Sequence, residues 1–266
     1  MAAAGAPAPD FDSLLGEYQR FRSGYPPELY QRVLAAAPLR PRVLDVGHGT
    51  GLAAEGLRDS IAMLVGVDVA PRMLRASPAA AKVQGRAEAL PFRDGAFDLV
   101  TCAQAFHWFQ PGPAFTQFHR VLRPSGAAAV WWKYEAQDDP TAQLADRVVS
   151  GLLGRPAPAT PLAREAVLPG ARESPFGGWE EVRLVHPLRH TVASYVGWQA
   201  SREVLRQAAG PRRDEVLAAL EGALRARHGE EAFEVRQLVR LCLLRKADAA
   251  GAPEGSKGRS GLRRPC

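Results

Sequence analysis

The sequence has few cysteines, with three among 266 residues. Cys102 and Cys242 lie far apart in apolar stretches, and Cys266 is the last residue. This usage excludes a disulfide scaffold and provides no paired thiols of the kind that bind zinc. The histidines also lack the spacing of metal ligands. We therefore expect no metal, and reduced thiols typical of the cytoplasm, with the nucleus as the alternative.

Long hydrophobic runs are absent as well. No apolar run approaches the roughly 18 residues of a membrane-spanning helix, and the opening MAAAGAPAP lacks the charged start of a secretory signal. We expect no membrane contact. The net charge of +6 is weak support for a nucleic-acid partner, because residues 249–266 hold four basic residues against one acidic residue and contribute +3 of it. Residues 1–9 and 249–266 have little to bury, so we expect both to be flexible.

Between these ends, short apolar segments alternate with amphipathic ones. The expected strands are residues 42–46, 63–67, 82–84, 97–103 and 127–132, with helices at 52–57, 71–76 and 113–122 between them. This alternation predicts an α/β fold with a parallel sheet and helices on both faces. After residue 133 the pattern changes to helices at 142–153, 195–207 and 214–227 and strands at 181–186 and 235–245. We interpret residues 10–248 as one domain.

A glycine loop follows the first expected strand, in the stretch VLDVGHGTGL. In open α/β sheets this loop is the usual ligand site. A dinucleotide is disfavoured, because the third glycine comes one residue too early for G-x-G-x-x-G and because Asp45 would repel a pyrophosphate. Asp68 ends the second strand, where a carboxylate accepts hydrogen bonds from both ribose hydroxyls. A ligand with a ribose and a cationic centre but no phosphate, such as S-adenosylmethionine, suits these residues.

Four separated motifs extend this interpretation: DVGHGTG, VGVD, GRAEALPFRDGAFDLV and RVLRPSG. In this order and spacing they resemble the class I S-adenosylmethionine-dependent methyltransferases. The stretches YQRFRSGYP and QAFHWF resemble a small-molecule subgroup that includes trans-aconitate methyltransferase. The resemblance implies a Rossmann-like, mostly parallel sheet of seven strands whose last strand is antiparallel. It also implies an N-terminal lid (residues 10–40), a cofactor-binding core (41–135) and a C-terminal half with cap helices (136–248).

The resemblance implies cofactor roles at matching positions. The glycines would line the methionine and ribose portions, Asp45 would lie near the amino group, and Asp68 would take the ribose. The full expected set is Arg22, Asp45, Gly47, Gly49, Gly51, Asp68, Val69, Met73, Ala87, Glu88 and Gln104. Arg86 departs from the family pattern, so Glu88 or backbone must contact the adenine amine. We interpret His48 as a loop side chain turned away from the ligand.

On the substrate side, His107 is the candidate catalytic residue, either as a general base or as a neutral donor that orients an acceptor oxygen. Arg22 would pair with a carboxylate of the cofactor or the substrate. Trp198 and Arg202 are four residues apart and share one helix face. The other expected substrate residues are Tyr18, Trp108 and Trp132. Core packing, a backbone contact or a solvated helix face is the alternative role for each of these residues.

Together these features predict an enzyme, an S-adenosylmethionine-dependent methyltransferase acting on a small molecule. The subgroup resemblance implies O-methylation of a carboxylic acid. A carboxylate is already deprotonated, so positioning and exclusion of water can supply most of the acceleration. The alternatives are a phenol, a ring carbon, a protein side chain or a nucleic acid as methyl acceptor, or a cofactor-binding module without catalysis.

Overall fold

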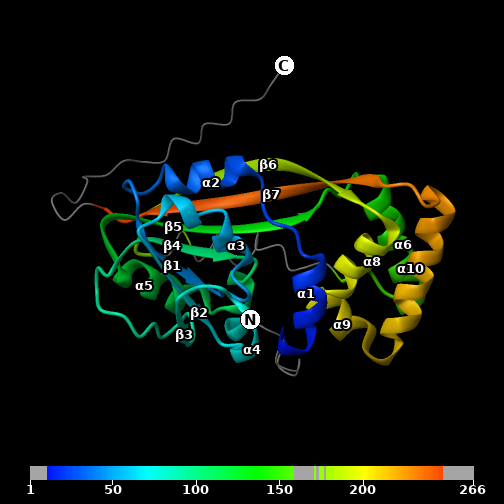
Figure 1. Cartoon of the computed structure of the whole chain (residues 1–266), viewed down its shortest axis with the longest axis horizontal. Coiled ribbons are helices and arrows are strands. Elements are labelled where there is room, and N and C mark those ends of the chain that lie inside the picture. The colour runs from blue at the N-terminus through cyan, green and yellow to red at the C-terminus, as the bar shows by residue number, and fades with distance from the viewer. Residues whose placement is uncertain (1–10, 159–170, 172–173, 177, 248–266) are drawn as a thin grey trace, which may run out of the picture.

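The computed structural model of the protein describes residues 11–158, 171, 174–176 and 178–247. Its centre is a seven-stranded sheet in the order β3-β2-β1-β4-β5-β7-β6 (Figure 1). The strands are β1 (Arg42–Val46), β2 (Met63–Asp68), β3 (Ala81–Gln84), β4 (Phe97–Ala103), β5 (Leu122–Glu135), β6 (Trp179–His190) and β7 (Phe233–Arg245).

Strands β1 to β5 pair in parallel, whereas β7 is antiparallel to both β5 and β6. The predicted fold class, a Rossmann-like sheet with an antiparallel last strand, is therefore confirmed. The end segments expected to be flexible, residues 1–9 and 249–266, lie outside the described residues.

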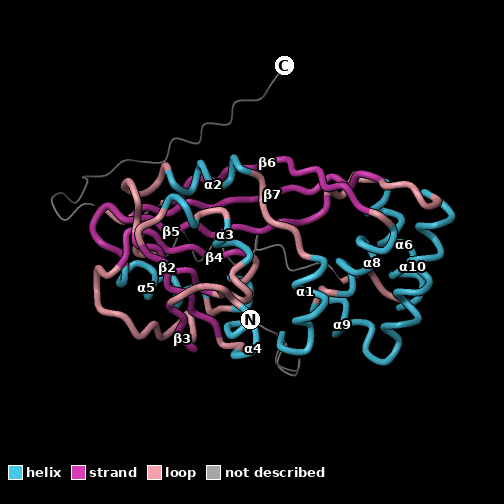
Figure 2. The backbone as a smooth tube through the Cα atoms, viewed as in Figure 1, coloured by secondary structure: helices cyan, strands magenta, loops and turns pink. Residues whose placement is uncertain are grey.

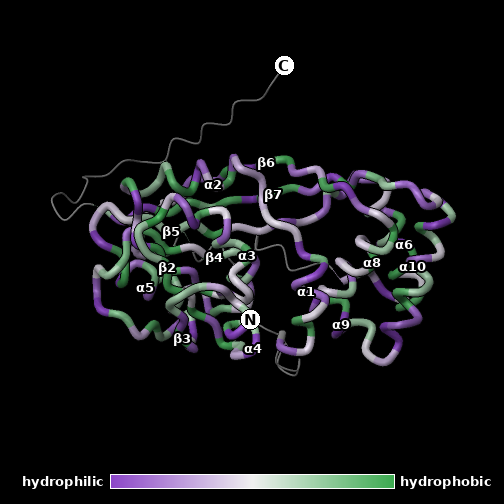
Figure 3. Tube along the Cα trace, in the orientation of Figure 1, coloured by the Kyte–Doolittle hydropathy of each residue, from purple (hydrophilic) through white to green (hydrophobic). Residues whose placement is uncertain are grey.

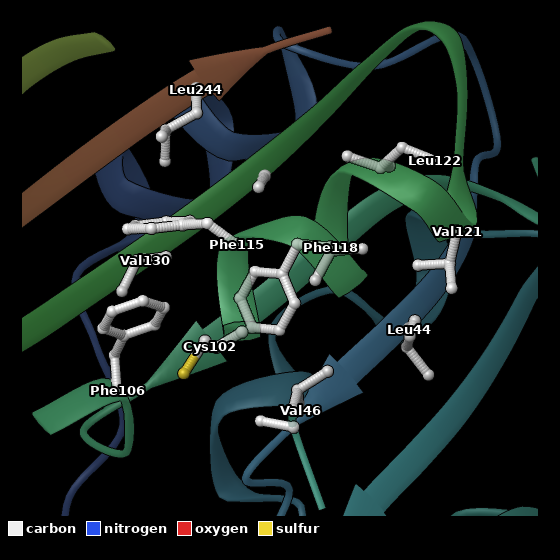
Figure 4. Close-up of a cluster of buried hydrophobic side chains, with 14 of the residues drawn as sticks. Leu44, Val46, Cys102, Phe106, Phe115, Phe118, Val121, Leu122, Val130 and Leu244 are labelled. Atoms are coloured by element: carbon white, nitrogen blue, oxygen red, sulfur yellow. The ribbon is translucent and has the colours of Figure 1, made fainter. Parts of the chain in front are cut away.

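Helices cover both faces of the sheet, as its apolar strands require. On one face, α2 (Pro27–Leu34) and α3 (Leu52–Glu55) pack in a cluster that includes Leu29 and Trp131. On the other face, α5 (Pro111–Val121) contributes Phe115 and Phe118 to a cluster whose packing Figure 4 shows. The sheet is thus a buried layer that holds its strand ends rigidly.

The longest strands extend past this core and carry a cap of helices (Figure 2). The cap comprises α6 (Pro140–Leu153), α8 (Val192–Ala200), α9 (Glu203–Ala209) and α10 (Arg213–His228). It has a core of its own, in which Tyr195 and Leu220 are fully buried. In Figure 3, hydrophobic and hydrophilic residues mix along α10, as expected of a helix with one buried face.

One helix expected at residues 195–207 is instead two, α8 and α9. The Ser201 hydroxyl donates to the carbonyl of Trp198 at 2.6 Å, and a second helix starts at Glu203. Serine side chains compete with the backbone for such carbonyls, so serine disfavours continuation of a helix. The break places Arg202 at the junction of the two helices.

The N-terminal segment, η1 (Phe11–Leu14) and α1 (Leu15–Phe21), lies between the core and the cap (Figure 1). On the core side, the Asp12 carboxylate accepts hydrogen bonds from the amides of Arg72 (3.0 Å) and Met73 (3.2 Å) in α4 (Pro71–Ala76). On the cap side, Phe21 packs against Gly197, where an added Cβ would lie 2.5 Å from the ring. The segment therefore bridges the two parts.

Candidate functional site

A cavity lies where the carboxyl ends of β1, β2, β4 and β5 meet α1 and the cap. Most residues expected at the site line it, although they come from six separate stretches of chain. These residues are Tyr18, Arg22, Gly47, Gly49, Asp68, Val69, Met73, Ala87, Gln104, His107, Trp108, Trp198 and Arg202. Four expected residues do not line the cavity: Asp45, Gly51, Glu88 and Trp132.

The glycine loop and Asp68 form one end of the cavity. Gly47 and Gly49 have φ angles of 73° and 55°, which favour glycine. The Gly49 amide donates to Asp68 Oδ2 at 2.7 Å, and the Ala70 amide donates to Oδ1 at 2.9 Å. These two bonds orient the carboxylate at the cavity wall, while burial raises its pKa.

This end fits a nucleoside without phosphate. A Cβ added at Gly49 would meet no atom within 4 Å, so the loop faces open space that a ligand can fill. Each Asp68 oxygen keeps acceptor capacity for a ribose hydroxyl. Val69, although apolar, is 50% exposed at the wall, as suits contact with a flat ring. The loop residues, Gly47 to Gly51, include no lysine or arginine that would bind a phosphate.

Asp45 faces away from the cavity and is 1% exposed. Its Oδ2 is 2.8 Å from His48 Nδ1, and its Oδ1 accepts from the Thr101 hydroxyl at 2.6 Å. The other ring nitrogen of His48 lies 2.7 Å from Ser77 Oγ. The loop histidine is therefore turned away from the ligand site, and it ties the loop to β1 and to the end of α4.

The other three residues outside the cavity also have identifiable partners. Gly51 lies beside His48 and Ser77, at the start of α3. Glu88 accepts a hydrogen bond from the Gln110 amide at 2.9 Å and pairs with Arg86 at 3.4 Å, so it braces two loops. Trp132 is buried, and its indole Nε1 donates to His107.

Two cations line the cavity on its cap side, and neither forms an ion pair with a described carboxylate. Arg22 donates to the Ser201 hydroxyl (2.9 Å) and carbonyl (3.0 Å). Arg202 donates to Gln199 at 2.7 Å and to the Pro158 carbonyl at 3.1 Å. Within the described ranges, neither guanidinium has a carboxylate oxygen within 4 Å. Their positive charge is available to an anionic ligand.

Sequence reasoning missed Lys133 and Glu135, two ionisable residues at the end of β5 that line the cavity. Lys133 Nζ donates to the Ser23 carbonyl and hydroxyl and to the Gly24 carbonyl, and burial beside Arg22 lowers its pKa to about 7. Glu135 accepts from the hydroxyl of Tyr195, and burial raises the pKa of its carboxyl group. Charged residues at the end of an otherwise apolar strand were the available signal.

We expect the free energy of unfolding to fall as the pH drops from 6.5 to 4. Burial lowers the pKa of His107 and of His190 to about 4, from an ordinary 6.5. At a pH well above 6.5 both rings are neutral in the folded and in the unfolded state. Below it the unfolded chain binds protons first, so each ring removes stability on the order of 3 kcal/mol by pH 4.

Urea denaturation at pH values between 7.5 and 4.5 measures this loss. The variant His107→Asn carries no titrating ring at that position and is expected to show a shallower decline. Equal stability of the natural protein at pH 7 and pH 5 would contradict the expectation.

Among the described residues, no group of histidine, cysteine, aspartate and glutamate side chains has the arrangement of a metal site. No helix in that part of the chain is long and apolar enough to cross a membrane.

Sequence comparison identifies relatives of this chain. Residues 44–130 match the family model of a methyltransferase domain. An uncharacterized methyltransferase of Mycobacterium tuberculosis is 40% identical over 126 residues, which are 46% of this chain and 51% of that protein. An uncharacterized methyltransferase of Schizosaccharomyces pombe is 26% identical over 153 residues, 55% of this chain and 61% of that protein. The chain thus spans about half the length of the curated relatives it matches.

Comparison with solved structures covers more of the chain. A protein of Anaeromyxobacter dehalogenans, provisionally assigned as a type II methyltransferase, aligns with a TM-score of 0.66 at 24% identity, over 85% of this chain and 98% of its own. The YcgJ protein of Bacillus subtilis aligns with a TM-score of 0.50 at 19% identity, over 83% of this chain and 98% of its own. These likenesses concern the fold. The chain contains a methyltransferase domain over residues 44–130, within a sheet of the class I methyltransferase fold, and this domain implies S-adenosylmethionine as its cofactor.

Proposed function

We propose that this protein transfers a methyl group from S-adenosylmethionine to a carboxylate oxygen of a small organic acid. The observation that carries the proposal is the pair of cations, Arg22 and Arg202, which line the cavity beside Ser201 and Gln199 of the cap. Both guanidinium groups are partly buried, and a partly buried cation without an ion-pair partner costs free energy that an anionic substrate lowers.

No acidic residue in the described lining of the cavity forms an ion pair with either cation within 4 Å, although Glu135 and Asp146 attract Arg202 from a longer distance. Glu135 accepts from Tyr195, and Glu203 pairs with Arg206 at 2.6 Å. Asp68 is bonded to two amides, and Asp146 is exposed. The likeness of YQRFRSGYP and QAFHWF to the trans-aconitate methyltransferase subgroup supports the same substrate class.

In this proposal the chain positions its two ligands. Gly47, Gly49 and Asp68 hold the cofactor, which supplies a methyl group on a cationic sulfur. Arg22 and Arg202 hold the substrate anion, and α1 covers the cavity and excludes water. A carboxylate needs no base, so holding the two reactants close in a dry site supplies most of the acceleration.

The test is incubation of the purified protein with isotope-labelled S-adenosylmethionine and a fractionated metabolite extract. Mass spectrometry then identifies any compound that gains a methyl group in place of a hydrogen. We expect the label in the organic-acid fraction, as a base-labile ester. Label confined to phenols, amines or proteins would contradict the carboxylate acceptor.

For the acid so identified, we expect Arg202→Gln to raise KM by about tenfold or more, because it removes a charge-assisted hydrogen bond. The matched control is Arg212→Gln, which alters an exposed pair with Glu215 away from the cavity. Equal effects of the two variants on KM would exclude Arg202 as a substrate ligand.

A further inference from the structure

We propose that His107 is a fixed hydrogen-bond donor to the substrate carboxylate, and that Trp132 is the positioning residue that makes it a donor. The inference rests on the proposed function and deepens it, since it decides between the two roles that the sequence left open for His107. The role of His107 also bears on whether the methyl acceptor binds in its protonated or its deprotonated form.

The contact between the two side chains assigns the proton of the imidazole. Trp132 Nε1 lies 3.2 Å from His107 Nδ1. An indole N–H can only donate, so Nδ1 must accept and carries no proton. A neutral imidazole has one N–H, which is therefore on Nε2. That nitrogen makes no hydrogen bond to any residue in the described part of the chain, and His107 lines the cavity.

Both partners are held in place. Trp132 is 3% exposed, lies within β5 and pairs in register with Arg240 of β7, so its indole cannot move away. His107 lies in the short η3 helix (Phe106–Trp108), which buried Phe106 anchors in the core. Burial also lowers the pKa of His107 to about 4, so the ring is neutral near pH 7.

This arrangement disfavours His107 as a general base. The lone pair that would take a proton is the Nδ1 lone pair, and Trp132 occupies it. His107 therefore does not deprotonate the acceptor, which suits a carboxylate that arrives already ionised. The carboxylate oxygen forms the new O–C bond as the C–S bond breaks, the bonding pair stays on sulfur, and no proton moves.

The donated bond should act on substrate binding more than on the chemical step. During transfer the carboxylate loses its negative charge, so a hydrogen bond to it weakens on the way to the transition state. We therefore expect loss of the donor to raise KM while kcat changes little. A general base would behave in the opposite way.

Nitrogen-15 NMR of the histidine-labelled full-length protein tests the assignment without any substrate. We expect the His107 signals of a neutral ring protonated on Nε2 at pH 7, identified by their absence in His107→Asn. In Trp132→Phe the Nδ1 atom loses its donor, so the ring is no longer held in the form protonated on Nε2. Trp131→Phe should leave the tautomer unchanged, because the Trp131 indole nitrogen has no partner among the described residues. A ring protonated on Nδ1, or a cationic ring at pH 7, would overturn the proposal.

Kinetics with the acid identified above provides the second readout. His107→Ala is expected to raise KM about tenfold or more, and His107→Asn, which keeps an N–H donor, should recover most of that loss. A His107→Asn variant as inactive as His107→Ala, with kcat lowered instead of KM raised, would overturn the donor role. If no acid is methylated, the proposed function fails, while the NMR result still decides the tautomer.

Discussion

Replacing Asp68 with alanine is expected to weaken the binding of S-adenosylhomocysteine, the demethylated cofactor, by at least about 100-fold. The reason is the loss of two charge-assisted hydrogen bonds to the ribose, each worth about 1.5–3 kcal/mol. Asp68 also accepts from the amides of Gly49 and Ala70, so its removal loosens the loop that carries the other cofactor contacts. Isothermal titration calorimetry measures the dissociation constant.

Glu88→Ala is the informative control for this experiment. The family resemblance places Glu88 at the adenine edge, whereas its contacts here are with Gln110 and Arg86, outside the cavity lining. We expect its dissociation constant to change by less than about threefold, as for a residue without a ligand contact. A loss of affinity in Glu88→Ala as large as in Asp68→Ala would show that the adenine lies nearer to Glu88 than this geometry implies.

Replacing Gly66 with alanine is expected to cost about 3–5 kcal/mol of stability, a larger effect than most single substitutions have. A Cβ at this position would lie 2.5 Å from the His48 ring. The ring cannot yield cheaply, because its nitrogens are bonded to Asp45 and Ser77 in a buried site. Overpacking costs about 1–3 kcal/mol, and an unsatisfied buried polar group costs a similar amount.

Thermal unfolding should show this cost as a fall in Tm of roughly 10 °C for a chain of this size. The matched control is Gly222→Ala, on the exposed side of α10, where an added Cβ meets nothing within 4 Å. There alanine should stabilise the helix by about 1 kcal/mol. If Gly66→Ala unfolds at the same temperature as the natural protein, His48 does not fill the space beneath the loop.

Several elements of the site were predictable from short stretches of sequence. The apolar strands with helices between them predicted the parallel sheet, because hydrophobic periodicity is a local property. The positions of Gly47, Gly49 and Asp68 at the ends of β1 and β2 followed, since parallel strands end at the same edge. Arg22, His107 and Arg202 were also identified as candidates, although they are far apart in the chain.

The strand pleat decided the position of Asp45. Successive side chains of a strand point to opposite faces, and Val46 takes the cavity side of β1. Asp45 therefore points away from the cavity and meets Thr101, which is 56 positions away in the chain. The strand was predictable from its composition, but which face a ligand would use was not.

The sequence by itself determined the sheet, the glycine loop and the acid that follows the second strand, because each depends on residues a few positions apart. Only the tertiary structure decided which of the candidate side chains face the cavity and in which protonation state. The Trp132–His107 bond spans 25 positions, and the Arg22–Ser201 contact spans 179. Such contacts arise when β5, η3, α1 and the cap pack together, and no local pattern of residues encodes them.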